Sequence, residues 1–573
     1  MFHVKQYDVI VVGGGHAGAE AAAAAARRGA WVALVTQSLD HVGVMSCNPS
    51  IGGLGKGHLV REVDALDGLM GRASDDAAIH YRMLNRSKGL AVRGPRIQAD
   101  RSLYRRSIHR QLAQLPALRQ VAGEAEALDI KGGKAVGVRL ANGGHLSGSA
   151  IVLATGTFLG GRIFRGHERE AGGRVGERPS TRLGEQLREL RLPMGRLKTG
   201  TPPRLDGRTV DWARLVSQPS DADQWRMSPI STGSRLPQLA CGITRTNDHT
   251  HDLIRSGIAE SPLFSGAIEG GGPRYCPSIE DKVHRFGDRD GHQIFLEPEG
   301  LDDPTVYPNG ISTSLAADVQ VAMIQSITGL ERAVISQFGY AVEYDYVDPR
   351  ALDHRLALAA IPGVFCAGQL NGTTGYEEAA AQGVIAGLNA AACALGLSPA
   401  IVDRATGYIG VLIDDLVLQG ISEPYRMLTA RAEYRLALRA DNAETRLSSF
   451  AAEHGCLTST RRDHIDSRDL MRVRARSGDT IGVDPDIIQE VEEDERYAPY
   501  LQRQAAEIER MRRDDNVVVD ASAESLKSIA GLSNEMTERL LAAAPQTLGE
   551  ASRVRGITPA ALAALWLHAR RRA

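Results

Sequence analysis

Apolar runs separated by glycines and alanine-rich segments dominate the start of the chain. Residues 7–12 form a β-branched apolar run, and a glycine cluster leads from it into an alanine-rich segment that continues to about Arg28. Gly29 follows and precedes a second apolar run at residues 31–35. A strand, a helix and a second strand in this order predict a βαβ unit.

Later segments extend this pattern. Residues 135–140 and 145–149 flank an Asn-Gly pair, which predicts a β-hairpin. Buried strands are expected at residues 150–153 and 362–365, and the second of them leads into an alanine-rich helix. Such distant segments join into one domain around an insertion in flavoprotein folds, so we expect the same arrangement here.

The remaining chain divides by composition. Residues 200–290 are rich in proline, glycine, serine and threonine, which predicts an inserted domain of strands and loops. From about residue 400 the pattern turns helical, and the polar stretch 456–490 is expected to be a linker. We therefore predict an α/β fold that carries a separate helical C-terminal arm.

Composition narrows the class of protein. The formal net charge of −2 does not by itself indicate a nucleic-acid partner. Six scattered cysteines without a CxxC pair argue against a disulfide framework and against a metal site. The sequence contains no run of 18 or more apolar residues, so we expect no membrane-spanning segment. The chain enters its first strand directly after MFHVKQ, so we expect no targeting peptide and a cytoplasmic protein.

A glycine motif joins the first predicted strand to the first predicted helix. Gly13, Gly15 and Gly18 match G-x-G-x-x-G, which provides a tight turn, close approach of a pyrophosphate and close packing of helix on sheet. The predicted cofactor contacts are Gly13, Gly14, Gly15, His16, Ala17 and Gly18. The second strand ends at Thr36 without the usual acidic residue, and the Thr36 hydroxyl can substitute by binding the ribose.

Two further segments favour FAD over NAD at this motif. IVLATGTF at 151–158 resembles the ATG segment of two-dinucleotide flavoproteins, and GVFCAGQLNG at 363–372 resembles their second flavin motif. Gln369 stands where those proteins usually have Asp. The alternative interpretation of 363–390 is an ordinary strand–turn–helix.

Longer motifs are more specific than the dinucleotide pattern. They occupy residues 45–70, 198–204, 268–283, 292–300, 307–315, 371–383 and 423–436. Together they closely resemble the glucose-inhibited division protein A family of tRNA uridine 5-carboxymethylaminomethyl modification enzymes. The resemblance covers residues 1–448 and 495–573, whereas 449–494 is shorter than the family norm. Gln369 agrees with this family.

The resemblance implies both fold and activity. It implies a two-dinucleotide-type Rossmann-like FAD-binding domain, an inserted α+β domain and an all-α C-terminal domain. The implied boundaries are 1–199 and 291–395 for the FAD-binding domain, 200–290 for an inserted NAD(P)H-type domain, and 396–573 for a helical domain that docks tRNA and a partner.

The implied reaction adds an aminomethyl or carboxymethylaminomethyl group to C5 of the wobble uridine (position 34) of certain tRNAs. It uses FAD, NADH or NADPH, and 5,10-methylenetetrahydrofolate as the one-carbon donor. The family resemblance also implies a homodimer and a partner GTPase that forms a heterotetramer-type complex with it.

Carbon 5 of uracil is a poor nucleophile until a thiolate adds to C6, so this chemistry calls for a cysteine. Cys47 lies in a glycine-rich loop, and Cys276 follows Arg274 just before a predicted helix. The family resemblance assigns both as essential. Without it, either cysteine could equally be a small packed residue. Which of the two contacts the base stays open.

Further cofactor contacts follow from the resemblance alone. Ala125, Ser180 and Gln369 belong to the implied FAD site. The implied nicotinamide-dinucleotide site comprises Gly272, Pro273, Arg274, Tyr275, Pro277, Ser278, Ile279, Glu280, Asp281, Lys282, Val283, His284, Arg285 and Phe286. The alternative for this segment is a plain joint between a loop and a helix.

Two basic segments are candidates for RNA contact. Residues 81–110 hold nine Lys and Arg residues and one acid, with Tyr81 and Tyr104 as possible stacking partners for bases. A second set recurs at near-helical spacing. The candidate RNA-binding residues are Arg93, Arg96, Arg101, Arg426, Arg431 and Arg435. The alternative is a solvated basic face.

Three other functions compete. A folate- and FAD-dependent tRNA uracil-5-methyltransferase would share the flavin fold but would not need the long helical tail. An FAD/NAD(P)H oxidoreductase of a small molecule would leave the basic segments unexplained. A non-enzymatic RNA-binding protein would leave the flavin motifs unused.

Overall fold

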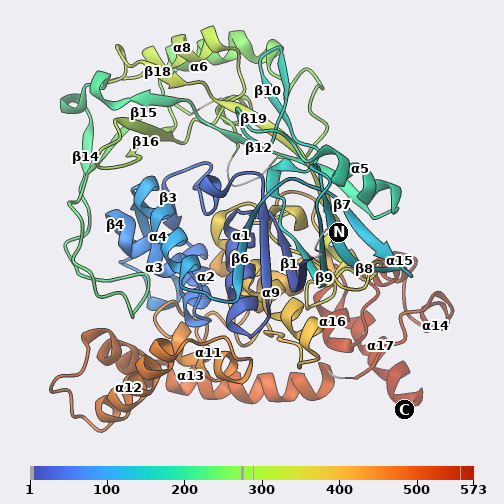
Figure 1. Cartoon of the computed structure of the whole chain (residues 1–573). Coiled ribbons are helices and arrows are strands. Elements are labelled where there is room, and N and C mark those ends of the chain that lie inside the picture. Colours follow the sequence, from blue (N-terminus) through green and yellow to red (C-terminus); the bar gives the residue numbers. More distant parts are fainter. Residues whose placement is uncertain (1–4, 273–276, 288, 516, 555, 573) are drawn as a thin grey trace.

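A seven-stranded sheet forms the centre of the computed structural model, which describes residues 5–272, 277–287, 289–515, 517–554 and 556–572 (Figure 1). β1, β2, β6, β9 and β20 pair in parallel, and β7 and β8 extend the sheet as antiparallel strands. The strands in spatial order are β6 (Leu118–Ala122), β2 (Val32–Thr36), β1 (Lys5–Val12), β9 (His145–Leu153), β8 (Lys134–Leu140) and β7 (Ala125–Lys131), with β20 (Val364–Cys366) beside β9.

The predicted βαβ unit and hairpin are both confirmed. β1, α1 (His16–Arg27) and β2 follow one another, and the β8–β9 hairpin turns at Gly143, whose φ of 80° suits glycine. Distant sequence segments join here, because β20 completes the sheet from residues 364–366. This is the α/β fold that the sequence predicts.

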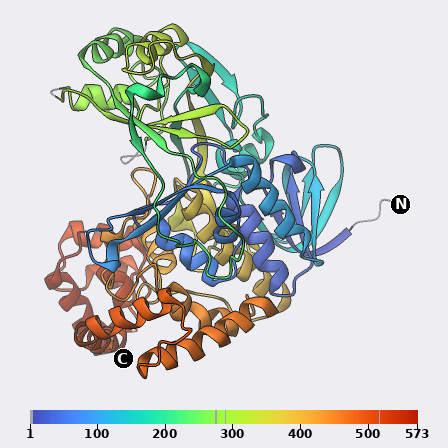
Figure 2. The same cartoon turned by 90° about the vertical axis from the view of Figure 1, so that its left-hand side faces the viewer.

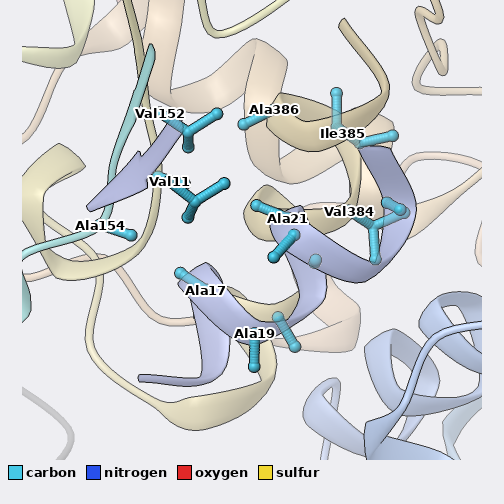
Figure 3. Close-up of a cluster of buried hydrophobic side chains, with 14 of the residues drawn as sticks. Val11, Ala17, Ala19, Ala21, Val152, Ala154, Val384, Ile385 and Ala386 are labelled. Atoms are coloured by element: carbon cyan, nitrogen blue, oxygen red, sulfur yellow. The ribbon is translucent and has the colours of Figure 1, made fainter. Parts of the chain in front are cut away.

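Two alanine-rich helices cover one face of the central sheet (Figure 3). α1 packs against α9 (Tyr376–Leu395), and Ala17, Ala21 and Val384 lie in the cluster between them and the sheet. Small side chains let the two helix backbones approach closely. Of the described helices, only α9 is long and apolar enough to cross a membrane by composition, and 78% of that window is buried inside the protein. A core helix passes the same test.

A second lobe lies at the top of Figure 1. Its six-stranded sheet has its own core, which includes Ile254, Leu296 and Met323, and α6 (Asp248–Gly257), α7 (Ile279–Arg285) and α8 (Ala317–Gln325) pack there. The strands in order are β14 (Val216–Gln218), β15 (Cys241–Arg245), β16 (Gln293–Pro298), β17 (Thr305–Asn309), β13 (Arg204–Asp206) and β18 (Ile335–Gln337). This sheet takes strands from both sides of residue 290; the predicted domain boundaries stay predictions.

Two smaller sheets connect the lobes. An antiparallel sheet contains β11 (Glu168–Ala171), β10 (Arg162–Arg165), β19 (Tyr340–Val347) and β12 (Met194–Thr201). A three-stranded sheet contains β3 (Ser50–Gly52), β5 (Gly94–Ala99) and β4 (Ala78–Leu84). The accompanying helices are α2 (Lys56–Ala65), α3 (Met70–Ala77), α4 (Arg101–Ala113) and α5 (Thr181–Glu189).

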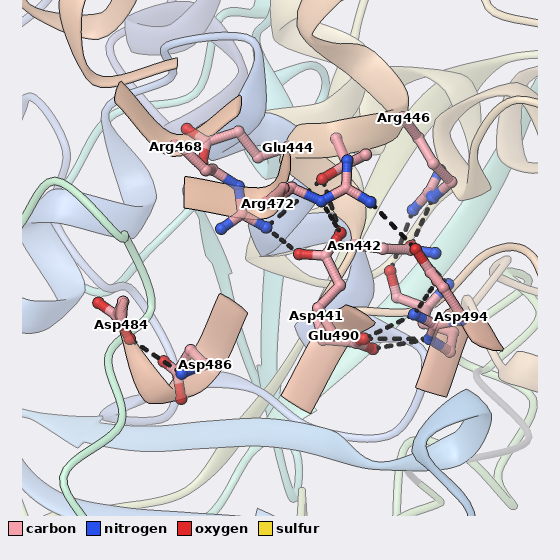
Figure 4. A network of polar contacts seen from close by, with 12 residues as sticks. Asp441, Asn442, Glu444, Arg446, Arg468, Arg472, Asp484, Asp486, Glu490 and Asp494 are labelled. Atoms are coloured by element: carbon pink, nitrogen blue, oxygen red, sulfur yellow. Dashed lines mark hydrogen bonds and ion pairs between the residues drawn. The ribbon is translucent and has the colours of Figure 1, made fainter. Parts of the chain in front are cut away.

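Helices make up the C-terminal third, on the opposite side of the central sheet from the second lobe (Figure 2). α11, α12 and α13 are joined by ion pairs, such as Arg472 with Glu490 at 3.3 Å and with Asp494 at 3.0 Å (Figure 4). The helices are α10 (Tyr408–Asp414), α11 (Ala443–Glu453), α12 (Ser459–Arg476), α13 (Pro485–Asp515), α14 (Ala523–Lys527), α15 (Asn534–Ala543), α16 (Leu548–Arg553) and α17 (Pro559–Arg572).

Three local predictions are wrong. Residues 456–490 are not a linker, since α12 occupies 18 of them. The arginine repeat at 426–439 is not an α-helix, because only a 3₁₀ turn forms at Thr429–Arg431. Tyr81 and Tyr104 are fully buried and therefore cannot stack on RNA bases in this fold.

Candidate active site

A cavity of about 450 Å³ opens where the central sheet meets the two smaller sheets. Its walls come from loops that are far apart in sequence. The residues used below that line it are Gly13, Gly14, Gly15, His16, Ala17, Thr36, Cys47, Lys56, Arg96, Ala125, Ser180, Thr201, Tyr307, Gln369, Tyr376, Glu377 and Arg426. Most of the predicted FAD contacts are therefore brought together in one cavity.

The glycine turn at the end of β1 has the geometry that a pyrophosphate needs. A Cβ on Gly13 would lie 2.2 Å from the Ala154 oxygen, and a Cβ on Gly18 would lie 1.7 Å from the Gly13 oxygen. Gly15, by contrast, has no heavy atom within 4 Å of its Cβ position and faces the cavity. Two glycines are thus required by packing, whereas the third leaves a cradle at the start of α1.

The opposite wall comes from the segment between β20 and α9. Gln369 lies in a short 3₁₀ turn at Gly368–Asn371, and Gly368 has a φ of 80°. Gly156 of the ATG segment also adopts a positive φ of 56° and lines the cavity beside Gln369. Both segments singled out as flavin motifs therefore meet at the cavity.

His16, the first residue of α1, is buried beside the glycine turn and carries no charge at neutral pH. Its ring stacks on Tyr376 with centroids 4.4 Å apart. Burial lowers the pKa of His16 to about 4. The positive character of the glycine turn therefore comes from backbone N–H groups and not from this imidazole.

A buried ion cluster supports the floor of the cavity. Lys56 lies 2.5 Å from Glu377 and 2.9 Å from Glu378, and Glu377 also accepts a hydrogen bond from Gly52 N–H at 2.7 Å. Burial opposes charge on Glu377, but Lys56 outweighs it and holds the pKa of that carboxyl below its usual range. The cluster fixes the start of α9 against β3.

Cys47 faces the cavity from the loop before β3. Its sulfur lies 3.3 Å from the Tyr307 hydroxyl and 3.9 Å from the Thr201 hydroxyl. Its backbone N–H is 2.5 Å from the Tyr376 hydroxyl, and its carbonyl accepts from Arg204 at 2.8 Å. The loop is thus held on both sides while the thiol remains partly exposed.

The other described cysteines have different surroundings. Cys241, Cys366 and Cys456 are buried, and burial raises the pKa of the Cys241 and Cys366 thiols to about 12. Cys393 is exposed on α9. Cys276 lies outside the described residues. Cys47 is consequently the one cysteine among those described that lines the cavity.

The described part of the predicted nicotinamide segment lies outside the cavity lining. Pro273, Arg274, Tyr275 and Cys276 lie outside the described residues. Ser278 caps α7, and Ile279 and Val283 are buried in the core of the second lobe. The described remainder of this segment, namely Gly272 and Pro277 to Phe286, does not line the cavity. Gly271 pairs with Leu197 of β12, whose end does line it.

The polar members of α7 make contacts within the lobe. Glu280 is buried and accepts from Ser314 N–H at 3.1 Å, and Lys282 donates to the Gly310 carbonyl at 2.7 Å. Asp281 pairs with Arg285 at 2.7 Å. His284 packs its ring against Phe264, and Phe286 is exposed.

The candidate RNA-binding arginines separate into two groups. Arg96 and Arg426 line the cavity, and Arg96 also pairs with Glu297 at 2.7 Å. Arg101 pairs with Glu299 and donates to the Met45 carbonyl. The rest lie away from the cavity: Arg93 donates to the Lys88 carbonyl, Arg431 stacks on Tyr425, and Arg435 is exposed.

Sequence reasoning missed four residues that line the cavity and one, Arg204, that hydrogen-bonds to the cavity residues Cys47 and Thr201. Lys56, Arg204, Tyr307, Tyr376 and Glu377 were not proposed as site residues, although each lies inside a motif that carried the family resemblance. Their position within these motifs was the only sequence signal that could have indicated them as site residues.

The site and the fold define the class of protein. A glycine turn after the first of several parallel strands, with its helix start facing a cavity, defines a dinucleotide-binding α/β protein of the flavoprotein type. A family model described as "Glucose inhibited division protein A" matches residues 8–398, and a model of the "tRNA modifying enzyme MnmG/GidA C-terminal helical bundle" matches residues 507–573. The chain belongs to the glucose-inhibited division protein A family, which is FAD-dependent.

Individual relatives agree with this assignment. The tRNA uridine 5-carboxymethylaminomethyl modification enzyme MnmG of Zymomonas mobilis is 56% identical over 99% of this chain and 98% of that protein. The enzyme of the same name from Granulibacter bethesdensis is 49% identical over 99% and 98%. A crystal structure of Aquifex aeolicus GidA superposes with a TM-score of 0.89 at 40% identity, covering 100% of this chain and 99% of that one.

Proposed function

We propose that this chain is an FAD-dependent tRNA-modifying enzyme. Together with a partner GTPase, it adds an aminomethyl or carboxymethylaminomethyl group to C5 of the wobble uridine (position 34) of certain tRNAs. One observation carries the proposal beyond family membership: the glycine turn and Cys47 line the same cavity. A bound dinucleotide and a reactive thiol can therefore serve one substrate.

The residues present fit FAD. The open side of Gly15 accepts a pyrophosphate, and the start of α1 directs backbone N–H groups toward it. Thr36 and Ala125 line the cavity where an adenosine would lie, and Gln369 lines the opposite wall. When bound, the flavin supplies the reducing chemistry of the reaction.

The protein supplies the reactive thiol and the arginines proposed to contact the RNA. Cys47 faces the cavity, where its thiolate can add to C6 of uracil and make C5 nucleophilic toward the one-carbon unit. Cys276 is proposed as the second essential cysteine on the family resemblance. Arg96 and Arg426, at the cavity wall, are proposed to contact the RNA, as are Arg93, Arg101, Arg431 and Arg435 outside it.

The remaining participants are proposed on the same resemblance. They are NADH or NADPH as reductant, with the segment 272–286 as its site, and 5,10-methylenetetrahydrofolate as one-carbon donor. We propose a cytoplasmic homodimer that binds the GTPase in a heterotetramer-type complex. The helical domain from residue 396 onward is proposed to dock tRNA and this partner, which favours the wobble enzyme over the uracil methyltransferase and the small-molecule oxidoreductase.

Nucleoside mass spectrometry of total tRNA tests the proposal. In cells that lack the protein, C5 aminomethyl-type wobble uridines should disappear while other modified uridines remain. Re-expression of the wild-type chain should restore them. Cys47→Ser and Cys276→Ser should not, although both purified variants should keep flavin absorbance. Cys393→Ser, on the exposed face of α9, is the matched control and should restore modification.

An unchanged nucleoside profile in the deletion strain would refute the wobble role and leave the small-molecule oxidoreductase as the leading function. Loss of 5-methyluridine instead would identify the methyltransferase. Purified protein free of flavin that still binds RNA would support a non-enzymatic role.

A further inference from the structure

Two residues from different sheets reach the sulfur of Cys47. Tyr307 lies on β17, and its hydroxyl oxygen is 3.3 Å from Cys47 Sγ. Thr201 ends β12, and its hydroxyl is 3.9 Å from the same sulfur. The loop of Cys47 belongs to the central domain, so residues more than 150 positions away in sequence complete its surroundings. Tyr307 is only 5% exposed.

A single guanidinium holds these groups in place. Arg204 donates to the Cys47 carbonyl through Nη2 and to the Thr201 hydroxyl through Nη1, each at 2.8 Å. Its Nε donates to Glu299 at 2.8 Å, and its Cζ lies 4.6 Å from the centroid of the Tyr307 ring. The ion pair with Glu299 keeps Arg204 charged despite its burial, since it raises the pKa that burial alone would lower.

This geometry has a chemical consequence. A phenol hydroxyl at hydrogen-bond distance from a sulfur can donate to a thiolate but gains less from a neutral thiol. A cation over the ring withdraws electron density and makes the phenol a better donor. The Tyr307 hydroxyl is therefore placed to donate a hydrogen bond to a thiolate at Cys47.

We infer that Tyr307 is a positioning residue that holds and activates the Cys47 thiolate, with Arg204 as its support. The inference rests on the proposed role of Cys47 as a nucleophile in this cavity. It concerns the protonation and orientation of the sulfur before any substrate binds, so it is tested without tRNA, folate or the partner GTPase.

Alkylation of Cys47 in the full-length, flavin-loaded protein is the direct test. Iodoacetamide forms an S–C bond with the thiolate and releases iodide, and peptide mass spectrometry reports Cys47 separately from the other cysteines. Tyr307→Phe should shift the midpoint of the pH–rate profile upward and slow alkylation about tenfold at pH 7, because a hydrogen bond to a charged group is lost. Above the midpoint the variant should react faster than wild type, since an unbonded thiolate is the stronger nucleophile.

The crossing of the two pH–rate profiles distinguishes activation of the thiolate from a packing role of Tyr307. Loss of packing alone would change the alkylation rate by the same factor at every pH. Tyr346→Phe removes a hydroxyl from β19 outside the cavity lining, and its midpoint should match wild type. Replacement of Tyr307 by 4-aminophenylalanine keeps the packing and a polar group but weakens the hydrogen-bond donor, so it should also shift the midpoint upward. This variant decides the matter if Tyr307→Phe fails to fold or loses flavin.

Unchanged midpoints in both Tyr307 variants would overturn the inference. Failure of the proposed function is a separate outcome. If Tyr307→Phe shifts the Cys47 profile but deletion of the protein leaves the wobble uridines intact, the activated thiol stands and its assigned substrate is wrong. If both hold, Tyr307→Phe should lower the modification rate at pH 7 and recover part of it at pH 9.

Discussion

Gly13, Gly15 and Gly18 serve three different physical needs in one turn. Gly13 has a φ of 113° and abuts the Ala154 carbonyl, and Gly18 abuts the Gly13 carbonyl. Gly15 has an ordinary φ of −71° and open space where a side chain would begin. The motif therefore combines two positions set by folding with one set by the ligand.

Alanine substitutions should separate these needs. Gly18→Ala should destabilise the flavin-free protein by about 2–4 kcal/mol, because its Cβ would overlap a backbone oxygen. Gly15→Ala should cost less than about 1 kcal/mol in the flavin-free protein, the ordinary cost of an N-cap change, but should abolish flavin binding. Thermal melting of both apo-proteins and flavin titration measure the two effects. Normal flavin affinity in Gly15→Ala would contradict the assignment of this cradle.

Sequence predicted the residues of this turn because strand, turn and helix are neighbours in the chain. Cys47 was also predicted, since its motif and chemistry are local. Tyr307 and Arg204 were not, because their roles depend on contacts with Cys47 across 260 and 157 positions. A hydrogen-bonding partner that folding alone brings close leaves no spacing signal in the sequence.

At the scale of elements, the contact of α1 with α9 decides how the cavity is built, because both helices begin at its edge. A Cβ on Gly383 would lie 2.2 Å from the Ala17 oxygen, and one on Gly387 would lie 2.2 Å from the Ala21 oxygen. Glycine at these positions lets the helices pack backbone to backbone (Figure 3). The starts of both helices are thereby placed at the same cavity.

Gly387→Ala should therefore destabilise the protein although alanine favours helix. The gain of about 1 kcal/mol in helix propensity is smaller than the cost of separating two packed backbones. We expect a net loss of about 2 kcal/mol and weaker flavin binding, measured by thermal melting and flavin titration. Cys393→Ala on the exposed side of α9 should leave both unchanged. A Gly387→Ala protein as stable as wild type would show that the helices can separate without cost.

The predictions of secondary structure failed in segments that are buried through ion pairs and that lack a hydrophobic periodicity. α12 looked like a linker because it is polar, yet Arg461 and Arg468 are buried and pair with carboxylates of α2, α11 and α13. The near-helical spacing of the arginines at 426–439 suggested a helix. Arg439 is instead buried in an ion pair with Asp494 at 2.7 Å. Burial through ion pairs depends on partners elsewhere in the chain, so local patterns do not predict it.

At the scale of the whole molecule, one carboxylate connects the C-terminal bundle to the central domain. Asp414 ends α10 and lies 2.9 Å from Arg553 of α16, 3.1 Å from Arg404 and 3.1 Å from His354. Arg553 belongs to the bundle that the second family model matches. Docking of this bundle, which we propose to bind tRNA and the GTPase, is thus linked to a titratable group.

The direction of this linkage follows from the pKa of His354. Burial alone would lower the pKa of His354. The hydrogen bond and charge of Asp414, together with the charge of Glu550 on α16, raise this pKa above its ordinary value of 6.5. Asp414 itself is kept ionised, because His354, Arg553 and Arg404 outweigh its burial and lower the pKa of its carboxyl. The contribution of His354 to docking is therefore complete below pH 6.5 and is lost as the pH rises through its raised folded value.

Limited proteolysis at constant protease activity should reveal this dependence. In the wild-type protein, release of the C-terminal bundle should be several-fold slower at pH 6 than at pH 8.5, because charged His354 adds to the Asp414 contact only at the lower pH. Asp414→Asn should increase release at both pH values, since Arg404 and Arg553 lose their shared partner. His354→Ala should show the wild-type rate at pH 8.5 and no slowing at pH 6. His145→Ala, whose ring pairs with Asp129 of β7 and not with Asp414, should retain the wild-type pH dependence. Equal slowing at pH 6 in His354→Ala and in wild type would assign the effect to another group.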